Sequence, residues 1–324
     1  ILLTCGASPA LVLALTALAR RSRGSHATIA LVLGGAGAAL FYGDAIITPA
    51  LSVLSAVEGL KTIPGAESMF GQQRVIAITI AILVGLFLIQ SRGTQSVSRF
   101  FGPVCVVWFV AIAALGVYHI ADEPSILRAF LPNYGIGFLF THGLVGLLVL
   151  AVVFVAVAGA EALTADMGHF GRRPIVLGWF ALVGPSLVLN YLGQGAFALE
   201  AAAAAGKPFV NQDWFFLMAP PMFRVGLVLL ATLATIIASQ AVITGAFSLT
   251  QQAIQLGLLP RLRIRQTSAD HSGQIYLPSI NWLLLVGVLV LVVQFRTSSS
   301  MAAAYGIAVT GTMVITTCLA YIVV

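Results

Sequence analysis

The sequence predicts an all-α integral membrane protein, a polytopic bundle of about eight transmembrane helices preceded by a partial N-terminal segment. Hydrophobic residues make up 60% of the chain and charged residues only 8%, whereas an average soluble domain has about 25% charged residues. The mean hydropathy is +1.04. The charges gather in short segments between long apolar stretches, which is typical of membrane spans joined by loops.

The apolar stretches appear in order along the chain, each near or above the ~17–25 residues that cross hydrocarbon. We expect spans at residues 28–58, 75–91, 100–120, 142–165, 174–199, 222–256, 280–295 and 300–324. Residues 1–19 hold Gly6, Ser8 and Pro9 early, so we expect only a partial or interfacial segment there. The chain starts at Ile1 and stops at Val324 inside an apolar run, and we interpret it as one membrane domain from a longer protein.

The basic residues divide unequally between two alternating sets of loops. The set comprising 20–27, 92–99, 166–173 and 257–279 holds ten of the sixteen lysines and arginines. Because cytoplasmic loops are enriched in these residues, we place this set inside the cell and expect a multi-pass protein of the cytoplasmic membrane. Basic residues confined to such loops argue against nucleic-acid binding, and the three cysteines match no metal or redox spacing.

A carboxylate, a proline and two hydroxyls interrupt the first long span. Helical geometry places Asp44, Thr48 and Ser52 at i, i+4 and i+8, which aligns their oxygens on one face. Pro49 has no N–H, so the carbonyl of Ala45 loses its helical partner and becomes an available acceptor. A column of oxygens is the type of ligand set that a hard cation prefers, and an ionisable residue at membrane depth is a functional candidate by default.

A second carboxylate lies near the end of the fourth expected span. Gly159 permits a broken helix just before Glu161, and discontinuous helices in transporters expose backbone carbonyls that coordinate cations. Glu161 is therefore a candidate for cation coordination, for proton carriage or for both. Asp166 at the cytoplasmic mouth is a weaker candidate.

Structural roles compete with each of these assignments. Asp44 could pair helices, Glu161 could cap a cytoplasmic helix, and Thr48 and Ser52 could bond backward to their own helix. Asp166 lies close to cytoplasmic arginines and is favoured as a loop-anchoring charge. We also interpret three polar stripes as packing and gating positions before ligands, namely Gln240, Thr244, Ser248, Gln251 and Gln255, then Asn190, Tyr191 and Gln194, and the segment that begins at Tyr305.

No enzyme signature is present in the sequence, so we do not expect an enzyme. There is no HExxH, phosphate-binding glycine loop or recognisable Ser-His-Asp arrangement. Paired intramembrane acids could still do general acid–base work, which leaves an intramembrane hydrolase as a minor alternative.

Five stretches closely resemble the signatures of the KUP/HAK/KT family of potassium uptake transporters. They are FYGDAIITPALSVLSAVEGL (41–60), EALTADMGHFG (161–171), LNYLGQGA (189–196), IASQAVITGAFSLT (237–250) and AAAYGIAVTGT (302–312). The resemblance covers nearly the whole chain, in order.

This resemblance implies a fold similar to the amino acid–polyamine–cation (LeuT-like) superfamily, with two inverted five-helix repeats around a central site. On that map 28–58 is similar to the third helix and 142–165 to the broken sixth. The first helix, the start of the second, the last helices and a soluble C-terminal domain are absent from residues 1–324. The family commonly has a threonine three residues before the sixth-helix carboxylate, and this chain has Ala158.

The function that the resemblance implies is potassium uptake by symport with protons. Potassium would bind Thr48, Ser52 and Glu161, with carbonyls near Gly159, while Asp44 would relay a proton or tune the potential. No cofactor is expected besides potassium as substrate and the proton as coupling ion. The expected partners are these ions and the lipid bilayer, and a homodimer is also considered.

Two rivals change the substrate or the mechanism. An amino acid or sodium-coupled carrier of the same superfamily would need a helix N-terminus available for the substrate carboxylate. An ion channel should show a repeated filter-forming loop, and none is visible in the sequence.

Overall fold

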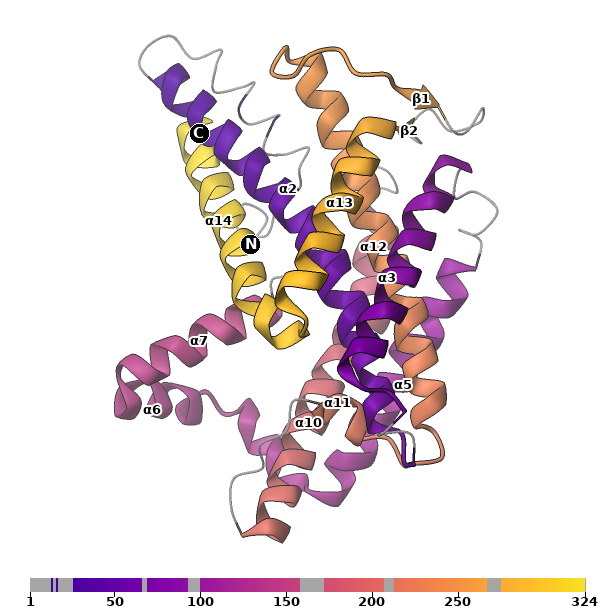
Figure 1. Cartoon of the computed structure of the whole chain (residues 1–324). Helices are drawn as coiled ribbons and strands as arrows, with labels where there is room; N and C mark the ends of the chain where they lie inside the picture. The colour runs from indigo at the N-terminus through magenta and orange to yellow at the C-terminus, as the bar shows by residue number, and fades with distance from the viewer. Residues whose placement is uncertain are drawn as a thin grey trace.

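The computed structural model describes residues 13, 16, 26–65, 69–92, 100–157, 172–206, 213–266 and 275–323, and nearly all of them are helical (Figure 1). The elements in chain order are α2 (His26–Glu58), η1 (Gly59–Thr62), α3 (Gln72–Ile89), η2 (Gln90–Arg92), α5 (Phe101–Asp122), η3 (Pro124–Phe130), α6 (Pro132–His142), α7 (Leu144–Val157), α9 (Arg172–Gly178), η5 (Trp179–Val183), α10 (Gly184–Ala205), α11 (Trp214–Leu217), α12 (Arg224–Gln255), β1 (Arg265–Gln266), β2 (Ile275–Tyr276), α13 (Pro278–Phe295) and α14 (Ser298–Val323).

Eight helical segments of the described residues are long and apolar enough to cross a membrane, as the sequence predicts. They are Thr28–Thr62, Gln72–Ile89, Phe101–Asp122, Pro132–Leu150, Arg173–Ala205, Arg224–Gln255, Pro278–Phe295 and Ser298–Ile322. The chain is therefore a polytopic, multi-pass membrane protein. Apolar side chains exposed on its helices are what a hydrocarbon solvent accommodates.

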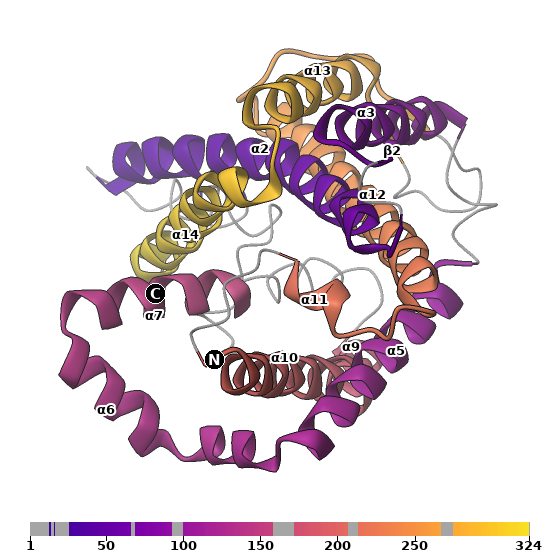
Figure 2. The ribbon, with the colours of Figure 1, turned by 60° about the horizontal axis from the view of Figure 1, so that its bottom comes forward.

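The predicted start of the fourth span is wrong. The chain is already helical from Pro132, and the segment is divided into α6 and α7 at Gly143, whose φ of 49° ends the first helix. Pro132 stands at the first helical position, where its missing N–H has no helical partner to lose. The predicted break near Gly159 lies outside the described residues. Figure 2 shows α6 and α7 as an arc standing apart from most of the bundle.

One short sheet departs from the all-α prediction. Arg265 pairs with Tyr276 and Gln266 with Ile275 in a two-stranded antiparallel ladder. In Figure 1 this ladder lies at the upper end of the molecule and α11 near the lower end. The ladder belongs to the arginine-rich loop 257–279, so the upper end is the one predicted to be cytoplasmic.

Helix α2 crosses the centre of the bundle and packs against α3, α12, α13 and α14. Its buried apolar residues recur at helical spacing, with Ala50, Val53, Leu54 and Val57 all between 0 and 2% exposed. These side chains join one core with residues of α3, α12 and α13. The core therefore holds α2 by one face and leaves the opposite face for the cavity described below.

Helices α5 and α10 form a second close pair. A Cβ placed on Gly116 would overlap the carbonyl of Leu189, and one placed on Gly193 would overlap the backbone of Gly116. Small residues at a crossing let two helix backbones approach closely within a membrane. The contact fixes α10 beside α5, and a π-helical turn, η5, precedes α10 in the same helical run.

Candidate functional site

A cavity of about 690 Å³ lies between α2, α5, α10, α11, α12 and the start of α14. Its polar lining residues are Ser52, Ser55, Glu58, Lys61, Gln72, Asn190, Asp213, Thr235, Thr297, Ser298 and Ser299. Its apolar walls include Trp108, Phe215 and Phe216. Several of the lining residues come from η1, the segment before α11 and the α13–α14 connection, which are external by the predicted orientation.

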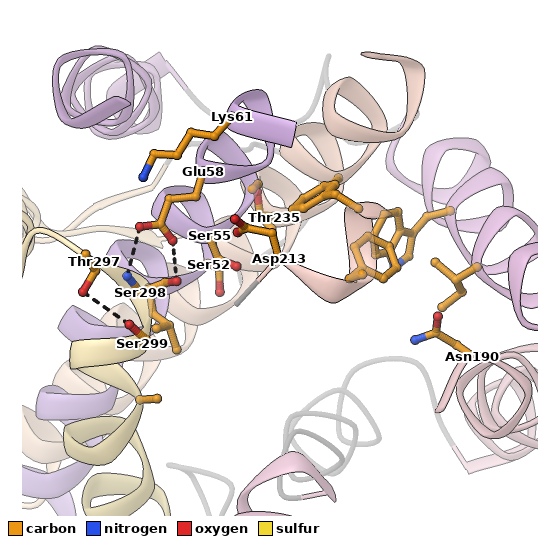
Figure 3. Close-up of a pocket in the computed structure, with 18 of the residues that line it drawn as sticks. Ser52, Ser55, Glu58, Lys61, Asn190, Asp213, Thr235, Thr297, Ser298 and Ser299 are labelled. Atoms are coloured by element: carbon orange, nitrogen blue, oxygen red, sulfur yellow. Dashed lines mark hydrogen bonds between the residues drawn. The ribbon is translucent and has the colours of Figure 1, made fainter. Parts of the chain in front are cut away.

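The α2 wall of the cavity is a line of oxygens. Ser52, Ser55 and Glu58 are three residues apart, so they lie on one helical face, and Figure 3 shows them together on the cavity side of α2. Thr235 of α12 also lines this space. The wall therefore offers hydroxyl and carboxylate oxygens to a solute entering from outside.

Asp44 and Thr48 continue the same helix further toward the cytoplasmic end. The Thr48 hydroxyl donates a hydrogen bond of 2.7 Å to the Asp44 carboxylate, and Asp44 is 7% exposed. The helical spacing that predicts their common face is confirmed by this bond. Neither side chain lines the cavity, whose α2 wall begins at Leu51 and Ser52, so the pair lies one to two turns deeper.

Glu58 caps the N-terminus of α14 at the edge of the cavity. Its carboxylate accepts hydrogen bonds from the Ser298 backbone N–H at 3.4 Å and from the Ser298 hydroxyl at 2.5 Å. The first N–H groups of a helix have no partner within the helix and attract negative charge. Glu58 therefore ties the outer end of α2 to the first turn of α14.

The outer mouth of the cavity carries both signs of charge. Lys61 donates to the Gln72 side chain at 2.6 Å, and Gln72 donates in turn to the Arg296 carbonyl. Burial raises the pKa of Asp213, and the positive charge of Lys61 opposes part of that rise. The net charge at the mouth therefore depends on the protonation of Asp213.

An aromatic wall faces the line of oxygens. The Trp108 and Phe215 rings are 5.6 Å apart between centroids, and Phe215 and Phe216 are 5.1 Å apart. Phe216 packs against Gly59, where a Cβ would come within 2.6 Å of its ring. The glycine after α2 thus lets α11 close over the outer end of this helix.

Asn190 places a polar group in the α10 wall. Its side chain is 6% exposed, and its Oδ1 accepts no hydrogen bond from any described residue. In Figure 3 it lies across the cavity from Ser52 and Ser55. Buried carbonyl oxygens normally have a partner, so this oxygen is available to water or a cation.

The structure separates the sequence-predicted site residues into three groups. Ser52 lines the cavity. Asp44, Thr48 and the fully buried Ala45 lie deeper on α2, and Tyr305 lies one turn beyond Ala302, which lines the cavity. Glu161, Gly159 and Asp166 lie outside the described residues, so their part in cation coordination stays a prediction.

Of the polar cavity residues, the sequence predicts only Ser52 as a ligand and gives Asn190 a packing and gating role; among those that it misses are Ser55, Glu58 and Asp213. Ser55 and Glu58 continue the oxygen-bearing face by spacing alone, and this signal could have identified them. Asn190 and Asp213 reach the cavity only because α10 and α11 pack beside α2. Oxygen donors of this kind suit a hard cation such as an alkali metal ion.

The sequence of the chain matches a known protein family. A family model described as the K+ potassium transporter integral membrane domain matches residues 10–324. The "Probable potassium transport system protein Kup 2" of Novosphingobium aromaticivorans is 65% identical over 315 residues, covering 96% of this chain and 50% of the relative.

Two further relatives agree with this match. "Probable potassium transport system protein Kup 1" of Rhizorhabdus wittichii is 65% identical over 316 residues, covering 97% of this chain and 49% of the relative. A Kup relative from Caulobacter vibrioides, with the same "probable" description, is 60% identical over 315 residues, 96% of this chain and 47% of the relative. The chain thus spans about half the length of the curated relatives it matches.

Proposed function

The chain belongs to the K+ potassium transporter family, and we propose on that basis that the whole protein carries potassium ions into the cell across the cytoplasmic membrane. The relatives are named as transporters of potassium. The observation that carries the proposal within the molecule is the cavity of about 690 Å³ lined by the oxygens of α2. Potassium would enter from the outer mouth and pass along Glu58, Ser55 and Ser52.

The lining favours a cation over an amino acid. A carrier for amino acids would need a helix N-terminus available for the substrate carboxylate. The N-terminus of α14 borders the cavity, but Glu58 already accepts hydrogen bonds from it. The oxygens of Ser52, Ser55 and Asn190 instead suit a positively charged solute.

The binding site proper is proposed to lie below the cavity. There Thr48 and Ser52 would coordinate potassium with Glu161 and backbone carbonyls near Gly159, in a LeuT-like arrangement of a third helix and a broken sixth. This proposal is supported by the continuity of one α2 face from Asp44 through the Asp44–Thr48 hydrogen bond to Ser52.

Proton symport is the proposed coupling mechanism. Asp44 is a buried carboxylate that already accepts one hydrogen bond, so a proton and a nearby cation would compete to neutralise it. A proton and the bound potassium ion would likewise compete to neutralise the Glu161 carboxylate. Binding of a proton at one carboxylate and potassium at the other would then favour joint translocation.

The test is growth of potassium-uptake-deficient cells at low external potassium. We expect the full-length protein to restore growth, and Thr48→Ala and Glu161→Gln each to impair it because each removes a ligand. Ser91→Ala is a matched control, since Ser91 is exposed in η2 and bonds only to the Leu88 carbonyl among the described residues.

The amount of protein in the membrane is measured for every variant, so that a variant that fails to transport is not confused with one that fails to accumulate. Growth of both ligand variants at the wild-type rate would overturn the site assignment. A wild type that takes up amino acids without any requirement for potassium would overturn the substrate assignment.

A further inference from the structure

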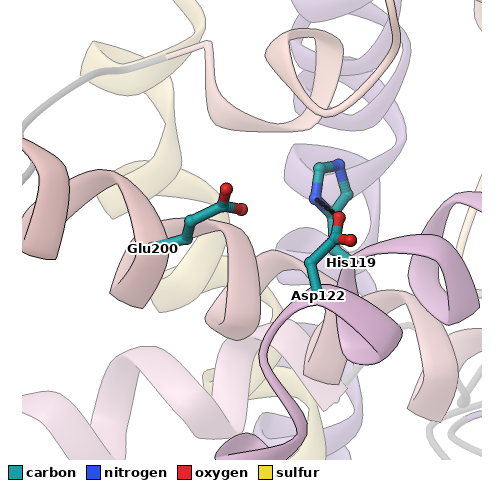
Figure 4. A group of neighbouring side chains, drawn as sticks. All are labelled: His119, Asp122 and Glu200. Atoms are coloured by element: carbon teal, nitrogen blue, oxygen red, sulfur yellow. Dashed lines mark ion pairs between the residues drawn. The ribbon is translucent and has the colours of Figure 1, made fainter.

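Three potential metal ligands meet at the outer ends of α5 and α10. They are His119, Asp122 and Glu200, and one ligand atom of each lies within 4.8 Å of the others. Figure 4 shows Glu200 rising from α10 toward the pair on α5. None of the three residues lines the cavity, and they have no part in the proposed potassium path.

The His119 ring is fixed in one orientation. Its Nε2 lies 2.9 Å from the Met218 carbonyl, and because a carbonyl can only accept, Nε2 must carry the hydrogen. The rings of Tyr118 and Phe197 pack edge-on against it, each at 5.1 Å between centroids. A histidine held through one nitrogen presents the other in a defined direction, which is a common feature of histidine metal ligands.

The second ring nitrogen points at the two acids. His119 is 6% exposed, and its Nδ1 has no hydrogen-bond partner among the described residues. Nδ1 lies 3.9 Å from Asp122 Oδ2, which is too long for a hydrogen bond. A buried nitrogen lone pair that faces carboxylate oxygens repels them unless a proton or a metal cation lies between.

The two carboxylates have no lysine or arginine as a partner among the described residues, and the one basic side chain beside them is His119. Asp122 and Glu200 are exposed. The cluster therefore combines two negative charges with one imidazole nitrogen, a donor set found around zinc and related divalent ions.

Close packing of α5 and α10 brings the ligands together. The two helices cross at Gly116 and Gly193, and one turn later the His119 ring contacts Phe197. A further turn brings Asp122 beside Glu200. Because the crossing fixes this register, the cluster is built into the helix pair.

We propose that His119 Nδ1, Asp122 and Glu200 bind one divalent transition-metal ion of the zinc class. Ligand bonds of about 2.0–2.2 Å require the three atoms to draw closer than they stand here, and the exposed carboxylates can rotate to achieve this. Three protein ligands leave a fourth position for water. The bound ion would join α5 to α10. Through His119 and Met218 it would also reach the end of α11, the helix whose Phe215 and Phe216 line the cavity.

The probe is Co²⁺ alone, added to tag-free full-length protein in detergent, with the visible absorption of the coordinated ion as readout. We expect saturable binding that Zn²⁺ reverses. His119→Gln should remove one bound ion per chain, and Asp122→Asn and Glu200→Gln should each weaken binding by about tenfold or more. The proposal is independent of the proposed transport function, because the readout is binding.

Matched controls are His142→Gln and Glu123→Gln. His142 is an exposed histidine of α6, and Glu123 is the acid adjacent to Asp122 but outside the cluster. Both variants should bind Co²⁺ as the wild type does. If His119→Gln fails to fold, His119→Cys replaces the nitrogen with a thiolate and should give a new ligand-to-metal band in the near ultraviolet.

Three results would overturn the proposal. The first is a wild type that binds no Co²⁺, and the second is a folded His119→Gln variant with wild-type stoichiometry and affinity. The third applies if His119→Gln does not fold, and it is the absence of the thiolate band in His119→Cys.

Discussion

Asp213 is an acid at the outer mouth of the cavity whose charge depends on pH. If it attracts potassium, Asp213→Asn should raise the apparent KM for potassium by about two- to fivefold, since two unit charges 4 Å apart in water interact by about 1 kcal/mol. Uptake by full-length protein at several potassium concentrations measures this change. The difference should shrink at high salt, because the Debye length is about 8 Å at 0.15 M.

The pH dependence of this effect has a definite sign. Burial raises the pKa of Asp213 above its ordinary value of 3.8, so the carboxylate loses its charge as pH falls through that raised value. As the pH is lowered, the KM of the wild type should therefore approach that of Asp213→Asn. Because the raised pKa lies above 3.8, this change should begin at a higher pH than it would for an ordinary aspartate. Glu123→Gln, outside the cavity, serves as the control. A KM ratio that is independent of both salt and pH would contradict this role for Asp213.

Local spacing predicts some site residues and misses others for a physical reason. The common face of Asp44 and Thr48 follows from helix geometry, and their hydrogen bond confirms it. Asn190 and Asp213 could not be predicted as neighbours of α2, because only the packing of α10 and α11 brings them there. The role of Glu58 as a cap of α14 likewise joins residues 240 positions apart.

The close approach of helices α5 and α10 requires glycine at their crossing. A Cβ on Gly116 would overlap backbone atoms of Leu189 and Asn190, which cannot move aside as a side chain can. Gly116→Ala should therefore separate the helices and destabilise the protein by about 1–3 kcal/mol, as overpacking typically does. Thermal unfolding of the full-length protein in detergent should show a lower midpoint.

Gly102→Ala is the matched control on the same helix. A Cβ at Gly102 meets nothing within 4 Å, and alanine favours a helix by up to about 1 kcal/mol over glycine. Its unfolding midpoint should be unchanged or slightly higher. Equal midpoints for Gly116→Ala and the wild type would show that the close crossing does not stabilise the pair.

Hydropathy predicts the existence of the eight spans but not every boundary. The early start of α6 was missed because Tyr134, Gly135 and Gly137 lower the apolar character of a segment that is nevertheless helical. For Gln240 the packing interpretation is confirmed, since it accepts a hydrogen bond of 2.8 Å from Gln90 of η2. The regular spacing of polar residues identifies such a helix face, but only the three-dimensional structure shows which residue pairs with it.

The long helix α2 lies between an apolar core and the cavity. One face of α2 packs into the core with α3, α12 and α13, and another lines the cavity with α10 and α11. Composition and charge pattern predict a multi-pass membrane protein, and only the motif resemblance predicts potassium transport. The cavity itself could not be predicted, because its lining residues come from helices that are far apart in the sequence and meet only in the folded chain.

We propose that potassium enters through this cavity together with protons. The most direct test reconstitutes the full-length protein in vesicles that enclose a pH-sensitive dye and imposes an inward potassium gradient. We expect potassium uptake with acidification of the lumen, neither of which occurs in protein-free vesicles. Potassium entry with no accompanying proton movement, or no potassium entry at all, would contradict it.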